Sequence, residues 1–213
     1  GSLGEPLYLD VMAALSEHSL SGLTVTGGRY GLGSKDVPPS AIIAAYRNLQ
    51  AQSPKTRFTL GITDDVTHLS LPVGENPDTT PAGTVPLKFW GLGSDGTVGA
   101  NKNSIKIIGD HTDKFVQAYF YYDSKKSGAV TVSQLRFGDK PIKSTYFVSK
   151  ADFVACHNTS YIGKYDMVQD LKPGGTFLLN CAWSVQELEA HLPAKDKKYI
   201  AENNIQLCTC DGI

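Results

Sequence analysis

The stretch that decides the fold of this 213-residue chain reads Gly91-Leu92-Gly93-Ser94-Asp95-Gly96-Thr97-Val98-Gly99-Ala100-Asn101-Lys102. It follows the short apolar segment 85–90 and opens a segment with helical periodicity. A glycine-rich turn between a strand and a helix N-terminus lets an anion approach the backbone closely, and the N–H groups and the helix dipole attract it. The stretch therefore predicts an anion site, although the pattern G-x-G-x-x-G is a weak signal by itself.

Strand-like and helical segments alternate around this turn. We expect helices over 96–108, around Met167 to Leu171, and from a Ser184/Glu187 capping box to Leu192. The expected strands are 85–90, 115–122, 129–135, 144–148, 152–156, 176–181 and 205–210. Repeated β-α-β units predict an α/β fold with a doubly wound, mostly parallel sheet, in which ligands bind beyond the carboxyl ends of the strands.

A proline-punctuated segment divides the chain. Residues 74–86 contain three prolines (Pro77, Pro81 and Pro86) and are expected to form a linker. Residues 1–73 contain only two helical segments (7–15 and 40–49) and two strand-like ones (23–26 and 57–62). Because so few elements can form only a small hydrophobic core, we expect a partial α/β domain that packs against structure outside this chain. Residues 87–213 then form a second domain, which we expect to be truncated.

Composition restricts the class of protein. A hydrophobic fraction of 41% and a net charge of −1 are typical of an ordinary globular protein, and scattered Lys and Arg residues give no support for nucleic-acid binding. We find no membrane span and no leader peptide. The four cysteines form no C-x-x-C pair, so we expect buried reduced thiols, no metal site and a cytoplasmic location. The opening Gly1-Ser2 resembles a cloning scar, which suggests an excised piece.

Several residues are candidates for cofactor binding. In the glycine loop they are Gly93, Ser94, Asp95, Gly96 and Asn101. Asp123 follows the next expected strand, where a dinucleotide fold places a ribose ligand, and Lys125 and Lys126 come directly after it. Two lysines there suit a phosphorylated ribose, as in NADP or coenzyme A, although a solvated lysine turn explains them equally well. Arg136 follows a further strand as another candidate phosphate ligand, with an ordinary surface arginine as the alternative.

Other candidates are weaker. His157-Asn158 follows an expected strand, where it could bind a carboxylate or amide or could simply form a turn. Asp64-Asp65 with His68 is more typical of a charged loop than of a metal site. No catalytic triad order, zinc-protease motif or Walker lysine is present, so we assign no catalytic residue.

Longer strings carry a resemblance to a known family. The residues from Lys88 to Lys106, together with 122–128, 135–138 and 152–158, resemble the gamma-type domain of pyruvate:ferredoxin (flavodoxin) oxidoreductases. Upstream, 28–35 and 64–67 resemble the end of the transketolase C-terminal-like domain that precedes it.

The resemblance implies a large enzyme, expected to be a homodimer, that decarboxylates pyruvate on thiamine diphosphate and forms acetyl-CoA. It further implies that electrons pass through 4Fe-4S clusters to ferredoxin or flavodoxin, and that coenzyme A phosphates lie near Lys125 and Lys126. The thiamine diphosphate signature and the cluster cysteines are missing from this chain, so we expect an inactive internal fragment that retains coenzyme A affinity. The alternatives are a small NADP-dependent oxidoreductase that uses Gly91–Gly96 and a purely structural packing domain.

Overall fold

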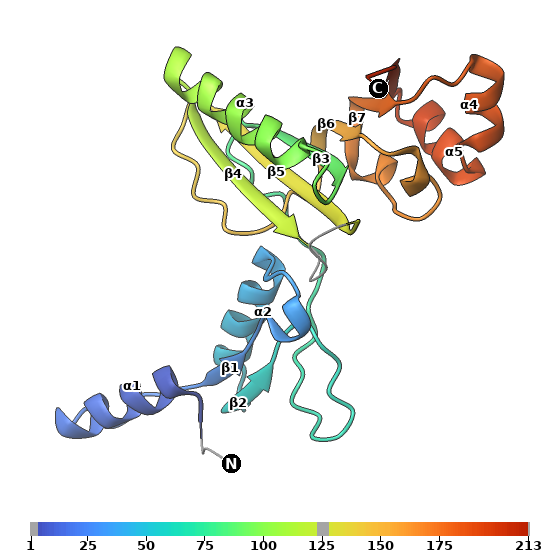
Figure 1. Ribbon diagram of the computed structural model, residues 1–213. Helices are drawn as coiled ribbons and strands as arrows, with labels where there is room; N and C mark the ends of the chain where they lie inside the picture. The colour runs from blue at the N-terminus through green and yellow to red at the C-terminus, as the bar shows by residue number, and fades with distance from the viewer. Residues whose placement is uncertain (1–3, 123–127, 213) are drawn as a thin grey trace. The chain divides into compact units, whose positions relative to one another are not determined.

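The computed structural model describes residues 4–122 and 128–212, and the chain divides into two compact units, Gly1–Thr79 and Thr80–Ile213 (Figure 1). The identities predicted for the two domains remain predictions, and each unit is described by itself. None of the helices within the described ranges is long and apolar enough to cross a bilayer.

The first unit is built on a two-stranded parallel sheet. Its elements are α1 (Pro6–Glu17), β1 (Gly27–Arg29), the 3-10 turn η1 (Leu32–Ser34), α2 (Pro39–Leu49) and β2 (Arg57–Thr59). Its small core consists of Ala41, Ala44, Phe58 and Leu60. The strand expected at 23–26 is wrong, because pairing begins at Gly27. A Cβ at Gly28 would lie 2.2 Å from the Phe58 ring, so close packing against that ring selects glycine there.

The second unit contains a six-stranded mixed sheet in the order β4-β5-β3-β6-β7-β8. β5 is antiparallel to both of its neighbours, and every other pair is parallel. The elements are β3 (Val85–Leu92), α3 (Thr97–His111), β4 (Phe115–Tyr122), β5 (Val130–Gly138), β6 (Ala151–Cys156), η2 (Thr159–Tyr161), η3 (Val168–Asp170), β7 (Leu171–Asn180), α4 (Val185–His191), α5 (Ala194–Glu202) and β8 (Gln206–Cys210). The predicted α/β class with a mostly parallel sheet is confirmed.

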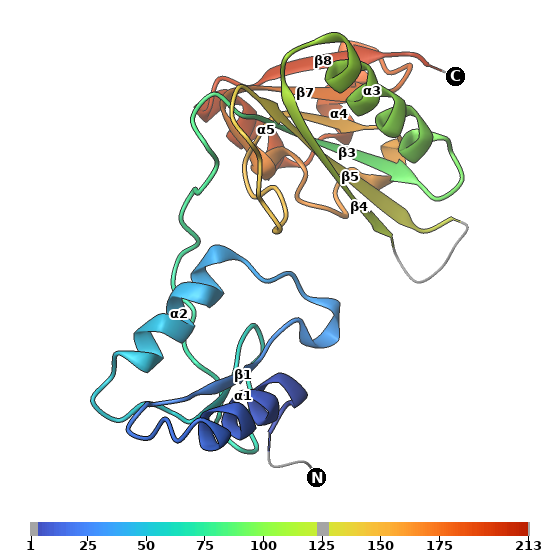
Figure 2. The same ribbon diagram turned by 90° about the vertical axis from the view of Figure 1, so that its left-hand side faces the viewer.

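Helices cover both faces of this sheet (Figures 1 and 2). α3 lies on the face that carries Phe120, because Lys102 Nζ of α3 is 5.4 Å from the centroid of that ring. α4 and α5 supply Leu188 and Tyr199 to the main core on the opposite face, where Trp90 also packs. The residues of this core that are least exposed include Val154, Cys156, Leu171, Phe177 and Leu179.

Two expected elements are wrong. Residues 144–148 are not a strand, because β5 already pairs with β3 on one side and β4 on the other. The helix expected around Met167 is only the one-turn η3, and β7 begins at Leu171. The Pro-Gly-Gly run after it lies inside β7. There the register with β6 shifts, and a Cβ at Gly175 would lie 3.0 Å from backbone oxygens.

A partly buried ion pair ties β3 to η3, directly before β7. Lys88 Nζ lies 2.8 Å from Asp170 Oδ2, and the two side chains are 11% and 25% exposed. Burial raises the pKa of Asp170, and the facing ammonium of Lys88 offsets only part of that effect. The pair therefore holds a carboxylate where the surrounding protein disfavours its charge.

Lys88→Met should lower the free energy of unfolding by about 2 kcal/mol at pH 7, because it strands the Asp170 charge. A carboxyl group whose folded pKa is raised disfavours the ionised folded state, so the loss should shrink as pH falls toward the unfolded value of about 4. Urea titrations at pH 7 and pH 5 measure it, with tryptophan fluorescence as the signal because Trp90 and Trp183 both lie in the second unit. Lys88→Met/Asp170→Leu is the control and should lie within about 1 kcal/mol of the parent chain. An equal loss in the single and double variants would contradict the prediction.

Candidate functional site

The connections of the sheet identify where a ligand fits. β3 and β6 are adjacent and parallel. After β3 the chain passes through α3 to β4, on one side, whereas after β6 it continues to β7, on the other (Figure 2). The carboxyl ends of two such strands flank a topological switch point, which is the ligand-binding position of open α/β sheets. The glycine loop follows β3 there, and His157 follows β6.

The glycine loop carries its own anion. The Asp95 carboxylate accepts the backbone N–H of Leu92 at 2.7 Å and that of Thr97, the first residue of α3, at 2.8 Å. Partial burial acts to raise the pKa of Asp95, but hydrogen bonds from Thr97 and Leu92 outweigh it, so the pKa lies below its usual value. A carboxylate thus occupies amides that a phosphate cradle would offer. The predicted anion site at the loop, and the predicted role of Asp95 in cofactor binding, stay predictions.

The turn itself needs unusual backbone angles at two of the predicted residues. Ser94 has φ 77° and Gly96 has φ 89°. The N–H of Gly93 donates to the carbonyl of Ala129 at 2.7 Å, which joins the loop to the residue before β5. These three residues shape the loop, and their predicted role in cofactor binding stays a proposal.

A hydroxyl links the loop to the end of β6. Thr97 is 3% exposed, and its Oγ1 lies 2.7 Å from Nδ1 of His157. The backbone N–H of the same Thr97 donates to the Asp95 carboxylate at 2.8 Å. Burial lowers the pKa of His157, and the nearby Asp95 charge opposes the shift without cancelling it. Two hydrogen bonds therefore join Asp95, Thr97 and the half-buried, neutral imidazole of His157 at the switch point.

Asn101 lies in α3 itself and is one of the buried residues of that helix. It is 4% exposed, and Nδ2 has no hydrogen-bond partner in the part of the chain that the structure describes. A buried amide can support the packing of the helix on the sheet, and the predicted role of Asn101 in cofactor binding stays a prediction.

Arg136 is not brought to the loop. In the antiparallel register Thr131 faces Gly91, whereas Arg136 faces Pro86, about 17 Å farther along β5 at a rise of about 3.4 Å per residue. Its guanidinium is 2% exposed and donates to Gln117 Oε1 at 3.0 Å and to the Tyr146 carbonyl at 2.8 Å. Arg136 thus holds residues 144–148 against the sheet, and its predicted role as a phosphate ligand stays a prediction.

Lys125 and Lys126 lie outside the described residues, as does Asp123. β5 lies between β4 and β3. At about 4.8 Å per strand, the end of β4 is therefore about 10 Å from the glycine loop. In a dinucleotide fold the corresponding strand lies directly beside the strand that leads into the loop. The described residues resume at Gly128. The next residue, Ala129, accepts a hydrogen bond from the backbone N–H of Gly93 in the loop.

The cysteines do not form a metal site. Among the described residues no group of three or more His, Cys, Asp or Glu side chains could hold an ion. Cys156 and Cys181 are buried, and burial raises the pKa of Cys156 to about 11. Cys208 and Cys210 are exposed on β8, so the expectation that all four thiols are buried is wrong. The residues present do not fit an iron–sulfur cluster, which needs several converging thiolates.

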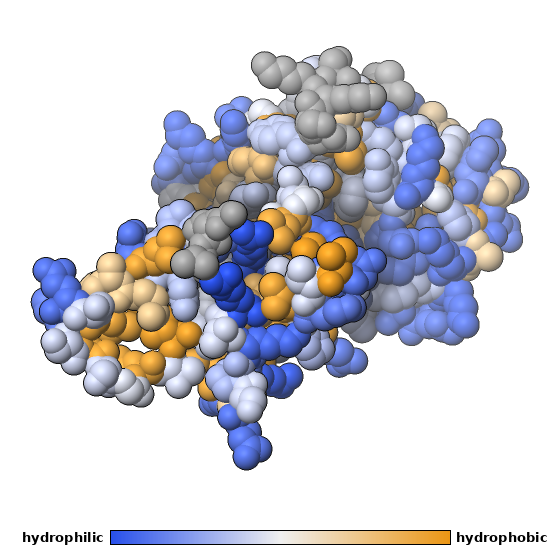
Figure 3. Space-filling model, turned by 90° about the horizontal axis from the view of Figure 1, so that it is seen from below, coloured by the Kyte–Doolittle hydropathy of each residue, from blue (hydrophilic) through white to orange (hydrophobic). Residues whose placement is uncertain are grey.

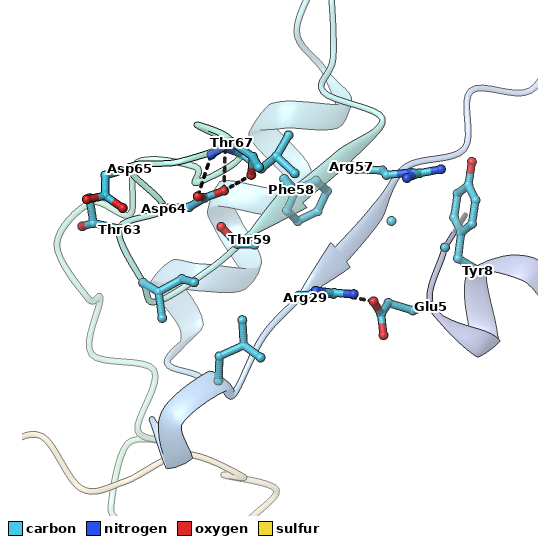
Figure 4. A pocket seen from close by; sticks show the side chains of 15 residues that line it. Glu5, Tyr8, Arg29, Arg57, Phe58, Thr59, Thr63, Asp64, Asp65 and Thr67 are labelled. Atoms are coloured by element: carbon cyan, nitrogen blue, oxygen red, sulfur yellow. Dashed lines mark hydrogen bonds and ion pairs between the residues drawn. The ribbon is translucent and has the colours of Figure 1, made fainter. Parts of the chain in front are cut away.

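The first unit holds a cavity of about 540 Å³ that sequence reasoning missed (Figure 4). Arg29 and Arg57 come to one face because Gly27 faces Arg57 across the two strands. Arg29 forms an ion pair with Glu5, and Arg57 extends toward Tyr8. The alternation of side-chain directions along 27–29 and 57–59 follows from the sequence once these segments are strands. That the two arginines share a face requires the register of the two strands, which the sequence does not supply.

The Asp64 carboxylate at the rim of that cavity is used within its own loop. It accepts the backbone N–H groups of Val66, Thr67 and Leu69 at 3.1, 2.9 and 3.2 Å, and also the Thr67 hydroxyl. Hydrogen bonds from Thr67 lead the effects that hold the pKa of Asp64 well below its usual range. This geometry agrees with the charged-loop interpretation of Asp64-Asp65.

Comparison with known proteins gives long matches. The chain is 58% identical over 213 residues to a pyruvate:ferredoxin oxidoreductase of Moorella thermoacetica and 58% identical over 214 residues to a pyruvate-flavodoxin oxidoreductase of Enterobacter agglomerans. Each match covers 100% of this chain and 18% of the relative. It is also 50% identical over 213 residues to a mitochondrial pyruvate dehydrogenase [NADP(+)] of Euglena gracilis, covering 99% of this chain and 12% of that protein.

A solved structure, pyruvate oxidoreductase subunit PORC of Thermotoga maritima, covers 61% of this chain and 62% of its own at 18% identity, with a TM-score of 0.46. The sequence model of the family described as pyruvate ferredoxin/flavodoxin oxidoreductase matches residues 87–212. The chain belongs to the pyruvate ferredoxin/flavodoxin oxidoreductase family.

Proposed function

We propose that this chain is one part of an enzyme that oxidatively decarboxylates pyruvate to acetyl-CoA and passes the electrons to ferredoxin or flavodoxin. Within that enzyme we assign it the binding of coenzyme A, and no catalytic group of its own. The observation that carries the proposal is 58% identity across the whole chain to relatives named for pyruvate and ferredoxin or flavodoxin. Thiamine diphosphate, the 4Fe-4S clusters and a dimer partner belong to the parent enzyme in this proposal.

We place coenzyme A at the switch point. Ala129 is hydrogen bonded to Gly93 of the loop, and Lys126 precedes Ala129 by three residues. Two lysine side chains there can meet the 3′-phosphate of coenzyme A as point charges, while Asp95 already neutralises the loop amides. The phosphates are therefore assigned to the lysines rather than to the glycine loop.

The test is calorimetry of coenzyme A binding to the 213-residue chain. Lys125→Ala/Lys126→Ala should weaken binding at least about tenfold, because charged hydrogen bonds to phosphate are lost. Dephospho-coenzyme A should bind the parent chain as weakly, and the double variant should no longer distinguish the two ligands. Lys197→Ala/Lys198→Ala, another adjacent lysine pair, is the matched control in α5 and should bind normally. No heat with millimolar coenzyme A would remove the proposal.

The choice of electron acceptor is assigned to other parts of the enzyme. Relatives that match nearly the whole chain at 50–58% identity are named for ferredoxin, flavodoxin and NADP. A segment that stays this similar across three acceptors does not specify one. The strand order weakens the alternative of a self-contained NADP enzyme. β3 and β4 would hold the dinucleotide, and β5 lies between them.

A structural role is the second candidate, and one observation favours it for the first unit. α1 buries none of its residues, and Leu7, Leu9, Val11 and Met12 are each at least 40% exposed. Figure 3 shows apolar side chains gathered where Figure 1 places α1. A helix of this length gains its stability from packing, so this surface suits contact with the rest of a longer polypeptide.

A further inference from the structure

The cavity of the first unit lies on the face of its sheet that α2 leaves uncovered. Phe58 of β2 packs into the small core with buried alanines of α2. Side chains alternate along a strand, so Arg57 and Thr59, on either side of Phe58, point to the opposite face. Gly27 and Arg29 of β1 lie directly across from these two residues and share their face. Both arginines therefore reach the side of the sheet where the cavity of about 540 Å³ lies.

Gly27 lets α1 pack a tyrosine against the sheet beside the cavity. A Cβ at Gly27 would lie 2.8 Å from the Tyr8 ring, so this close approach requires glycine. The Tyr8 ring forms part of the cavity wall, together with apolar side chains that include Leu32, Ile62 and Leu69. Small-molecule pockets have volumes of roughly 300–1,000 Å³ and are mostly apolar, with a few placed polar groups. The cavity therefore has the size and the lining for a small organic molecule.

The acidic groups around the cavity are engaged elsewhere or lie away from Arg57. Glu5 forms an ion pair with Arg29. The Asp64 carboxylate accepts the hydrogen bonds of its own loop, which hold its pKa well below the usual range. Figure 4 shows Asp65 on the far side of the cavity from Arg57. Within 4–122 and 128–212, no residue forms an ion pair or a hydrogen bond with the guanidinium of Arg57.

A guanidinium presents a planar fork of N–H donors that fits two oxygens of a carboxylate or of a phosphate. We propose that the cavity binds a small organic anion, in which a flat apolar body carries one carboxylate or phosphate group. The charged group pairs with Arg57, and the body lies against the Tyr8 ring and the neighbouring apolar side chains. This site belongs to the first unit, so it goes beyond the proposed function and does not depend on the coenzyme A site.

The test is an NMR titration of the ¹⁵N-labelled 213-residue chain with benzoate as the probe. The backbone amide signals of Gly27 and Thr59 and the side-chain N–H signal of Arg57 should shift together, with a Kd on the order of 1 mM. Benzamide has the same shape without the charge and should bind at least about tenfold more weakly. Equal affinities for the two probes, or no shift with about 10 mM benzoate, would overturn the proposal.

Phenyl phosphate distinguishes the two kinds of anion. Tighter binding of phenyl phosphate than of benzoate assigns the cavity to a phosphate ester, and the reverse order assigns it to a carboxylate. Either assignment requires that both probes compete for the same shifted signals. Separate sets of shifts for the two probes would contradict a single site at Arg57.

Two arginine substitutions in the same unit test the contact itself. Arg57→Gln removes the charge and the fork, so the Kd for benzoate should rise about tenfold or more and approach that for benzamide. Arg47→Gln is the matched control, because Arg47 is an exposed arginine of α2 that does not line the cavity. It should leave the Kd unchanged. An unshifted amide signal of the core residue Leu60 reports that each variant is folded. A folded Arg57→Gln chain that binds benzoate as tightly as the parent chain would refute the site.

Discussion

Phe177→Ala should lower the free energy of unfolding of the second unit by about 4 kcal/mol, the largest loss that we expect from a single substitution. Phe177 lies in β7 opposite Val154 of β6, and both side chains are 0% exposed. Truncation removes the ring's burial and leaves a cavity between two central parallel strands, whose pairing on both sides prevents collapse. β6 ends at the switch point, so a loosened β6–β7 pair should also disturb the position of His157.

Guanidinium denaturation followed by tryptophan fluorescence measures this loss, because both tryptophans report on the second unit. Val185→Ala is the matched control: Val185 is 75% exposed on α4, and its truncation should stay within about 0.5 kcal/mol of the parent chain. A loss below about 1.5 kcal/mol for Phe177→Ala would mean that the site collapses or that the ring contributes less than its burial implies.

Local signals in the sequence predicted the elements that depend on local chemistry. The strand expected at 115–122 is β4 with the same bounds, and the Ser184/Glu187 capping box opens α4 with both of its hydrogen bonds. Strand pairing is not local, and there the prediction failed. Residues 144–148 have the composition of a strand, but β5 had no free side to pair with them.

The direction of β5 is the error that mattered for the site, and the sequence held a signal against it. Only residues 123–129 separate β4 from β5. A parallel connection needs roughly a dozen residues or more, so a hairpin was the only short solution. A hairpin places Arg136 at the end of β5 that lies away from the glycine loop, opposite Pro86, and the structure has it there.

The hydrogen bond between Thr97 and His157 shows the other limit of sequence-based prediction. Asp95 was predicted as part of a phosphate cradle and His157 as a weak candidate, but Thr97 and His157 are 60 residues apart. Their contact exists because β3 and β6 are adjacent and parallel, which places the residues after both strands at one edge. No spacing within either segment carries that information.

Gly91→Ala should lower the free energy of unfolding by about 3 kcal/mol and should break the hydrogen bond between Thr97 and His157 at the same time. The added Cβ would lie 2.3 Å from Thr97 Oγ1 and 2.6 Å from Thr97 Cβ. Neither side can retreat easily: Gly91 is paired with Thr131 in β5 and accepts from the Tyr161 hydroxyl at 3.1 Å, while Thr97 is 3% exposed at the start of α3. The methyl group must therefore push α3 away from the end of β3.

Gly99→Ala separates this steric effect from the general effect of alanine. A Cβ at Gly99, within α3, meets nothing within 4 Å, so alanine there should add about 0.5–1 kcal/mol of stability by restricting the unfolded chain. Urea titration by tryptophan fluorescence gives both values, and the NMR shifts of the His157 ring report whether its contact with Thr97 changes in each variant. Equal stabilities for the two variants, or unchanged ring shifts in Gly91→Ala, would show that the loop can yield to a side chain. In that case Thr97 would not be held rigidly enough to orient His157.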